Sequence, residues 1–267
     1  MPVWDPSRYL QFSDARARPF LDLIAEVPTN PSTIVDLGCG PGQHTKHLRE
    51  RWPEALVLGI DASTEMIAEA IRENMDGLAN YDVADLTEWT PPEPVDLFLS
   101  NAVFQWVPDQ EVAIERLLPH LNDGGAFAIQ VPNNTGAATY RSLNELAEEE
   151  PYAQYLGDVR RLPWLEPDFY LNFFAERGYE VNAWESTYLH ILKDKGDDPV
   201  FDWISGTGAR PFLEALPDEL RDEFSEQLKL RLRAAYPARD WGTVLPYRRT
   251  FAVAYLCLLY TSPSPRD

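Results

Sequence analysis

The residues best placed to do chemistry lie in the stretch VDLGCGPG, where an apolar run ends in closely spaced glycines. Asp36 precedes Gly38, Gly40 and Gly42, and glycines in such a turn let the backbone approach a ligand closely. The pattern G-x-G-x-G differs from the G-x-G-x-x-G of dinucleotide-binding turns, and no Lys-Ser or Lys-Thr follows as in a triphosphate-binding loop. The turn therefore excludes triphosphate hydrolysis and disfavours a dinucleotide.

Two further aspartates follow apolar segments, Asp61 at the end of ALVLGID and Asp85 in YDVADL. A carboxylate at the first position can accept hydrogen bonds from both ribose hydroxyls. A carboxylate at the second can accept from an exocyclic adenine amine, while Leu86 packs near the ring. A single aspartate at a strand end is more often a helix cap. Together with the glycine turn, however, these aspartates indicate an adenosine site without a pyrophosphate.

The elements that must position these residues alternate between strands and helices. Short apolar runs predict buried parallel strands at 33–38, 55–61, 81–86, 95–101 and 126–132. Amphipathic patterns predict helices at 14–26, with Asp14 as N-cap, and at 42–52, 63–74, with Ser63 as N-cap, and 111–121. The segment NDGG, at 122–125, is expected to be a turn. This alternation predicts an α/β fold with a doubly wound, Rossmann-like, mostly parallel sheet.

Beyond Pro132 the alternation stops. Helices are predicted at 136–150 and 166–178, one or two strands at 179–192, a mostly helical stretch at 198–235 and a closing strand at 247–256. A helical insertion between the last two strands predicts a cap over the carboxyl edge of the sheet, where such folds bind ligands. The expected organisation is an N-terminal helical segment over the site at 1–30, a core at 31–186, a mostly helical substrate cap at 187–244, a closing strand at 245–256 and a non-native tail at 257–267.

The order DLGCGPG, GID and ADL resembles the class I S-adenosylmethionine-dependent methyltransferases, and LNDGGAF resembles the turn before their fifth strand. The resemblance covers Ile34 to Gln130 and implies S-adenosyl-L-methionine as cofactor. The residues it implies for cofactor binding are Asp36, Gly38, Gly40, Gly42, Asp61, Ala62, Met66, Asp85, Leu86, Asn101 and Ala102.

The end of the fourth predicted strand discriminates between methyl acceptors. It reads SNAVFQW, without the [DN]-P-P-[YF] of many amino-methylating enzymes, and no Pro-Cys nucleophile for cytosine methylation stands there. A small-molecule acceptor is therefore expected. The stretches WDPSRYLQFSDARARPF, NAVFQWVPD, TYLH, DWISGTGARPFL and PYRRTFAVA further resemble the trans-aconitate 2-methyltransferase family, which esterifies one carboxylate of trans-aconitate.

The residues need supply no base for that reaction, because a carboxylate with a reference pKa of about 4 is already ionised and nucleophilic at neutral pH. No catalytic acid or base is expected, and Gln105 and Arg210 are expected to position the reactants. A tricarboxylate substrate requires cations and hydrogen-bond donors, because its charge must be balanced in the site. The expected substrate-binding residues are Tyr9, Arg16, Gln105, Trp106, Tyr188, His190, Arg210 and Arg249, with Arg248 as a weaker candidate.

The formal net charge of −20 disfavours nucleic acid and anionic membranes as partners. Two distant cysteines fit a reducing cytoplasm, and the N-terminus lacks the pattern of a signal peptide. His44 and His47 lack further ligands nearby, so no metal site is expected. We also expect a monomer.

Three other functions fit parts of the sequence. Another small-molecule carboxyl- or O-methyltransferase would share the cofactor and differ only in the acid or alcohol methylated. A nicotinamide-dependent oxidoreductase is opposed by the glycine spacing and by Asp85. A module that binds the cofactor without turnover is opposed by the N-terminal segment and the cap.

Overall fold

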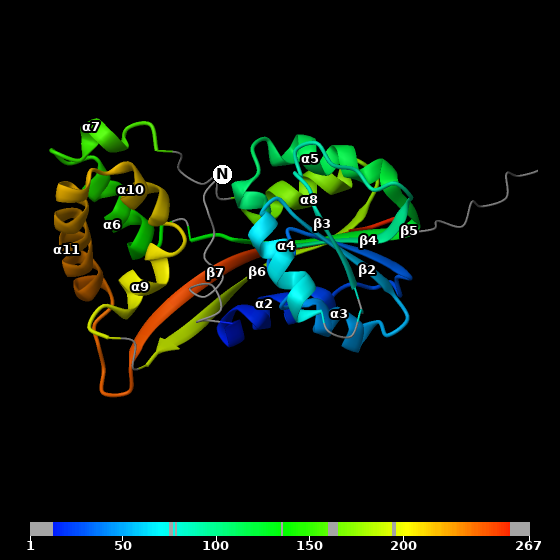
Figure 1. Cartoon of the computed structure of the whole chain (residues 1–267), viewed down its shortest axis with the longest axis horizontal. Helices are drawn as coiled ribbons and strands as arrows, with labels where there is room; N and C mark the ends of the chain where they lie inside the picture. Colours follow the sequence, from blue (N-terminus) through cyan, green and yellow to red (C-terminus); the bar gives the residue numbers. More distant parts are fainter. Residues whose placement is uncertain are drawn as a thin grey trace, which may run out of the picture.

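The computed structural model describes residues 13–74, 77, 79–134, 136–159, 165–193 and 196–256. Within them, strands form one seven-stranded sheet in the order β3-β2-β1-β4-β5-β7-β6 (Figure 1). Strands β1 to β5 are parallel, and β7 is antiparallel to both of its neighbours. The strands are β1 Thr33–Leu37, β2 Leu56–Asp61, β3 Ala79–Val83, β4 Val95–Asn101, β5 Leu121–Pro132, β6 Glu180–Leu192 and β7 Thr243–Tyr255. The predicted mostly parallel, doubly wound sheet is confirmed.

Helices cover both faces of this sheet because its central strands are apolar on both sides. Helices α5 (Gln110–Leu117) and α8 (Pro167–Ala175) pack on one face, and α2 (Ser13–Ala25) and α3 (Thr45–Arg51) on the other (Figure 1). Helix α4 (Thr64–Glu73) follows β2, and the short helices η1 (Phe104–Trp106) and η2 (Leu118–His120) flank α5. The side chain of Ser63 accepts a hydrogen bond from the Met66 N–H at 3.2 Å, so the predicted N-cap of α4 is confirmed.

A separate group of helices forms the cap: α6 (Ala138–Ala147), α7 (Ala153–Leu156), α9 (Pro199–Ser205), α10 (Arg210–Ala215) and α11 (Asp218–Ala235). Their buried side chains share one apolar cluster with Leu192, Leu245 and Tyr247, which lie on the distal halves of β6 and β7. These two long strands therefore extend from the sheet to the cap, as an arm that joins the two (Figure 1).

Three details differ from the sequence-based expectations. Residues 138–156, which the sequence assigned to the core, pack with the cap because Leu143 and Leu146 join its apolar cluster. The segment NDGG lies inside β5, which begins at Leu121 with a register shift against β4. The stretch 179–192 forms one continuous strand, since every residue from Glu180 to Leu192 pairs with β7.

Candidate active site

Hydrogen bonds join the glycine turn after β1 to Asp61, the last residue of β2. The N–H of Gly38 donates to the carbonyl of Ile60 at 2.7 Å. The N–H of Gly40 donates to Oδ2 of Asp61 at 3.0 Å, and the N–H of Ser63 donates to Oδ1 at 2.9 Å. Asp61 therefore fixes the turn, and because each carboxylate oxygen has two lone pairs, it can still accept from ribose hydroxyls.

The turn's three glycines have different neighbours. Their φ angles are +77°, +56° and +72°, in the left-handed region that favours glycine. A Cβ on Gly38 would lie 2.3 Å from Val103, and one on Gly42 would lie 2.8 Å from the Tyr81 hydroxyl. A Cβ on Gly40 would meet no atom of the described chain within 4 Å. Gly38 and Gly42 thus serve internal packing, whereas Gly40 borders open space in which a ligand can approach the backbone.

Asp36 in β1 and Asp85 just after β3 lie in contrasting environments. Burial, followed by the nearby charge of Asp61, raises the pKa of Asp36 to about 7. Asp85 is exposed, and its Oδ1 accepts from the N–H and the hydroxyl of Thr87 at 2.8 and 2.7 Å. These bonds lower the pKa of Asp85 and close a local turn. Asp85 therefore closes a turn of its own, and its role in adenine recognition stays a prediction; Leu86 beside it is buried.

A strained turn follows β4, where the methyl acceptor is expected. Ala102 has a φ of +60°, its N–H donates to the Gln130 carbonyl at 2.8 Å, and its own carbonyl accepts from Gln105 Nε2 at 2.7 Å. Oε1 of Gln105 and Oδ1 of Asn101 are buried and have no hydrogen-bond partner in the described part of the chain. Trp106 follows in η1 and is half-buried. The turn thus presents acceptor atoms beside the end of β4.

One face of the β6–β7 arm gathers several of the predicted substrate-binding residues. Tyr188 lies opposite Tyr247, and the His190 ring stacks on Trp203 of α9 with centroids 4.8 Å apart. The guanidinium of Arg249 lies 5.0 Å from the centre of the Tyr247 ring. Tyr188 and His190 therefore share one face of the sheet, as their two-residue spacing predicts, and Arg249 lies on the same face because it is two residues from Tyr247, which pairs with Tyr188.

Arg249 is buried, and its Nη1 donates to Oε1 of Gln130 at 3.0 Å. Burial lowers the pKa of His44 to about 3, and nearby positive charges that include Arg249 act in the same direction, so His44 is neutral. The Tyr188 hydroxyl donates to Asp22 at 2.6 Å. Donation from Tyr188 to a substrate carboxylate would therefore require that bond to break.

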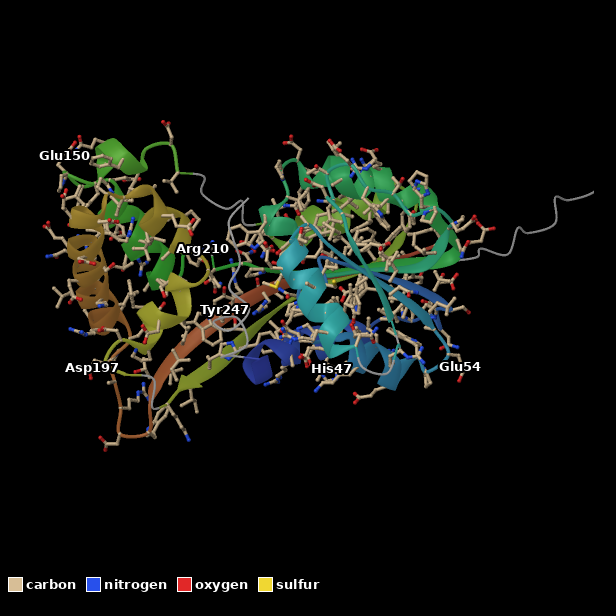
Figure 2. The ribbon with its side chains drawn as sticks, in the orientation of Figure 1. His47, Glu54, Glu150, Asp197, Arg210 and Tyr247 are labelled. Atoms are coloured by element: carbon tan, nitrogen blue, oxygen red, sulfur yellow. The ribbon has the colours of Figure 1, made fainter. Side chains whose placement is uncertain are left out.

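The cap reaches this face through a tyrosine that the sequence did not single out. A Cβ on Gly208 would lie 2.2 Å from the hydroxyl oxygen of Tyr140 in α6. Burial raises the pKa of Tyr140, and its hydrogen bond with Tyr247 adds to that effect. Nε of Arg210 donates to Glu214 at 2.6 Å along α10. Arg210 lies on the side of the cap that faces the sheet, and Tyr247 lies on the arm between them (Figure 2).

The three remaining candidates are Tyr9, Arg16 and Arg248. Tyr9 lies outside the described residues, as does the side chain of Arg16. Arg248 faces away from Arg249, toward α8, and its Nη2 donates to Glu166 at 2.9 Å. Sequence reasoning missed Tyr140, Tyr247 and Gln130. A weak signal existed for Gln130, since it is a polar residue inside the apolar run AFAIQVP.

The residues present fit the cofactor that the sequence indicates. Gly40 leaves room for a ligand against the backbone, Asp61 retains acceptor capacity, and a buried acceptor on Asn101 lacks a partner within the described chain. Among the described residues, no group of three or more His, Cys, Asp or Glu side chains is arranged to hold a metal ion. None of the described helices is long and apolar enough to cross a membrane.

Comparison with known proteins agrees with this architecture. Residues 9–183 match a family model described as a methyltransferase domain. The YcgJ protein of Bacillus subtilis has a similar fold, with a TM-score of 0.57 at 12% identity over 91% of this chain and 98% of that chain.

Two relatives resemble the chain over almost its whole length. A trans-aconitate 2-methyltransferase of Streptomyces avermitilis is 42% identical over 264 residues, which are 96% of this chain and 97% of that protein. A trans-aconitate 2-methyltransferase of Azoarcus sp. (strain BH72) is 40% identical over 257 residues, which are 95% of this chain and 99% of that protein. The match includes the cap as well as the sheet, and the chain therefore belongs to the trans-aconitate 2-methyltransferase family.

Proposed function

We propose that this protein transfers the methyl group of S-adenosylmethionine to a carboxylate of trans-aconitate, giving a monomethyl ester and S-adenosylhomocysteine. The observation that carries the proposal is the similarity to trans-aconitate 2-methyltransferases across 96% of the chain, cap included. The buried Arg249, whose Nη1 donates to Gln130 on β5, supports an anionic acceptor, since a guanidinium pairs well with a carboxylate.

When bound, S-adenosylmethionine supplies an electrophilic methyl group on a sulfonium, which an ionised carboxylate can attack directly. Gly40, Asp61 and Asn101 would hold this donor at the carboxyl edge of the sheet. The protein's own contribution is to bind, orient and desolvate the acid. Orientation of reactants can supply roughly 7–11 kcal/mol of a barrier.

No general base is required, because the acid is already ionised at neutral pH. Arg249 and Arg210 would balance the charge of the substrate, and Gln105 would line the turn beside the transferred methyl group. With saturating trans-aconitate, kcat should therefore stay constant between pH 7 and 9. A steep loss over that range that disappears in a variant of one site residue would contradict a mechanism without acid–base catalysis.

We further propose that the sheet binds the methyl donor, whereas the cap and the N-terminal segment enclose the acid. The apolar cluster that the cap shares with the β6–β7 arm supports these separate roles of sheet and cap. The net charge of −20 disfavours nucleic acid as a partner, and the two distant cysteines favour a reducing cytoplasm as the compartment. The protein is also proposed to act as a monomer. Light scattering after size-exclusion chromatography tests the oligomeric state.

The decisive experiment measures methyl transfer from labelled S-adenosylmethionine to trans-aconitate, cis-aconitate, isocitrate, citrate and a monocarboxylate. Base-labile methyl ester formed chiefly on trans-aconitate is the expected result. Ester formed chiefly on another acid would assign the protein a different carboxyl-methyltransferase activity. If no acid is esterified while S-adenosylhomocysteine still binds, the proposed substrate is refuted and the assignment of the cofactor is retained.

A further inference from the structure

Two buried side-chain amides near the end of β5 have N–H groups without acceptors among the described residues. Gln130 and Asn134 are 0% and 2% exposed. Neither Nε2 of Gln130 nor Nδ2 of Asn134 has a hydrogen-bond partner in the part of the chain that the structure describes. A buried donor left unsatisfied costs about 1–3 kcal/mol, so such a group calls for an explanation.

Reversal of the amides does not explain them. Oε1 of Gln130 accepts from Nη1 of Arg249 at 3.0 Å, and Oδ1 of Asn134 accepts from the backbone N–H of Arg248 at 3.0 Å. If either amide were turned over, its NH₂ group would face another donor. The hydrogen bonds of β7 therefore fix both amides with their N–H groups directed elsewhere.

The first of these donors belongs to the proposed site. Gln130 lies opposite Asn101 in the parallel pair of β4 and β5, and its carbonyl accepts from the N–H of Ala102 at 2.8 Å. Its side chain contacts the buried guanidinium of Arg249. Gln130 therefore joins the strained turn after β4, where the acid is methylated, to the cationic group that would bind it.

The second donor lies just beyond the end of β5. The neighbouring Asn133 directs its Nδ2 toward Thr250 and the carbonyl of Leu165, on the face that α8 covers. Oδ1 of Asn134 accepts from the backbone N–H of Arg248 at 3.0 Å, so the Asn134 side chain lies against β7 at the residue before Arg249. Both amides thus bond to β7 at Arg248 or Arg249, and neither NH₂ group has an acceptor within the described residues.

We infer that Gln130 and Asn134 donate hydrogen bonds to carboxylates of the substrate and, with Arg249, form its carboxylate-binding subsite. This inference rests on the proposed function, since it assigns residues to the same site. An ionised carboxylate brings about four lone-pair positions and no donor, so it satisfies both amides as well as the guanidinium. Neutral amides add directional recognition without adding a second buried charge.

Isosteric variants test the subsite. Gln130→Glu and Asn134→Asp keep the oxygen that accepts from β7, remove the donating NH₂ group and add a negative charge that repels the acid. Each should raise KM for trans-aconitate at least about 10- to 100-fold, because a hydrogen bond to a charged group is lost and the new carboxylate repels the acid. The Kd for S-adenosylhomocysteine, measured by calorimetry, should change less than threefold.

Gln110→Glu is the matched control, because Gln110 is also buried and also uses its Oε1 as an acceptor, from the Tyr170 hydroxyl at 2.7 Å. It lies in α5, away from Arg249, and the KM of this variant should match that of the unaltered enzyme.

A second measurement compares two acids. The ratio of variant to unaltered KM should be smaller for fumarate, which lacks one carboxylate, than for trans-aconitate.

Each outcome separates the subsite from the proposed function. KM changes below threefold in both site variants, or equal changes in Gln110→Glu, would overturn the inference. If Gln130→Glu fails to fold, Asn134→Asp still decides the matter. If the unaltered enzyme makes no ester, calorimetric binding of trans-aconitate is measured instead. Binding weakened by both site variants supports the subsite while the proposed reaction fails, and unweakened or absent binding overturns the subsite as well.

Discussion

Arg248 and Arg249 are consecutive in β7 and bond on opposite faces of the sheet. Nε of Arg248 donates to the Asn133 carbonyl at 2.9 Å, and its Nη2 donates to Glu166 at 2.9 Å. Nη1 of Arg249 donates to Gln130 at 3.0 Å on the other face. Arg248 thus binds the segment that leaves β5 for the cap, whereas Arg249 is the residue proposed to bind the substrate.

Lysine at each position should separate these roles, because lysine keeps the charge but loses the planar, forked guanidinium. Arg248→Lys should lower the free energy of unfolding by about 1–3 kcal/mol and change KM for trans-aconitate less than threefold. Arg249→Lys should raise that KM more than tenfold. Urea unfolding and steady-state kinetics measure both. The reverse pattern, with KM changed mainly by Arg248→Lys, would refute the assignment.

Alanine at Gly40 should weaken cofactor binding more than it weakens the fold. Gly40 and Gly178 both have positive φ, +56° and +85°, and a Cβ at either would meet no described atom within 4 Å. Both Gly40→Ala and Gly178→Ala should therefore lose about 1–2 kcal/mol from the backbone alone. Only Gly40→Ala should raise the Kd for S-adenosylhomocysteine, by tenfold or more in calorimetry. Equal Kd values would show that the space beside Gly40 does not hold the cofactor.

The sheet was predictable from sequence because its central strands are short, apolar and separated by amphipathic helices. Sequence patterns could not predict the order of β7 and β6 or the length of the arm that they form. Distal residues of this arm, such as Leu192 and Leu245, are buried in the apolar cluster of the cap. For the same reason 138–156 was assigned to the core. Its helix α6 is amphipathic, and nothing local specifies which apolar surface it covers.

The site was predictable where a local pattern requires a residue type. The positive φ angles of Gly38, Gly40 and Gly42 are such a case. Tyr140 was not predictable, because its role arises from contacts with Gly208 and Tyr247, which are remote in sequence. Asp61 and Asp85 illustrate the two cases. Asp61 bonds to the glycine turn, whereas Asp85 bonds to Thr87 in a turn of its own.

Asparagine at position 61 should disrupt the cofactor site, because both carboxylate oxygens accept backbone N–H groups and an amide offers only one oxygen. Asp61→Asn should raise the Kd for S-adenosylhomocysteine at least tenfold. Asp96→Asn is the control, since Asp96 accepts the N–H groups of Ser32 and Thr33 at 2.8 and 3.0 Å, near the opposite end of β4. Its Kd should stay unchanged, and equal losses in both variants would point to a general effect on the fold.

Buried Asp36 should make stability fall as pH rises. Burial and then the charge of Asp61 raise the pKa of Asp36 to about 7 from 3.8, so the unfolded state ionises first. The stability that neutral Asp36 contributes is fully present below about pH 4 and is lost progressively up to about pH 7. Asp36→Asn cannot ionise. Between pH 5 and pH 8 its free energy of unfolding should therefore rise relative to that of the unaltered protein by about 2–3 kcal/mol. Urea unfolding of both proteins at the two pH values measures this difference, and a difference that does not change with pH would show that Asp36 is ionised throughout.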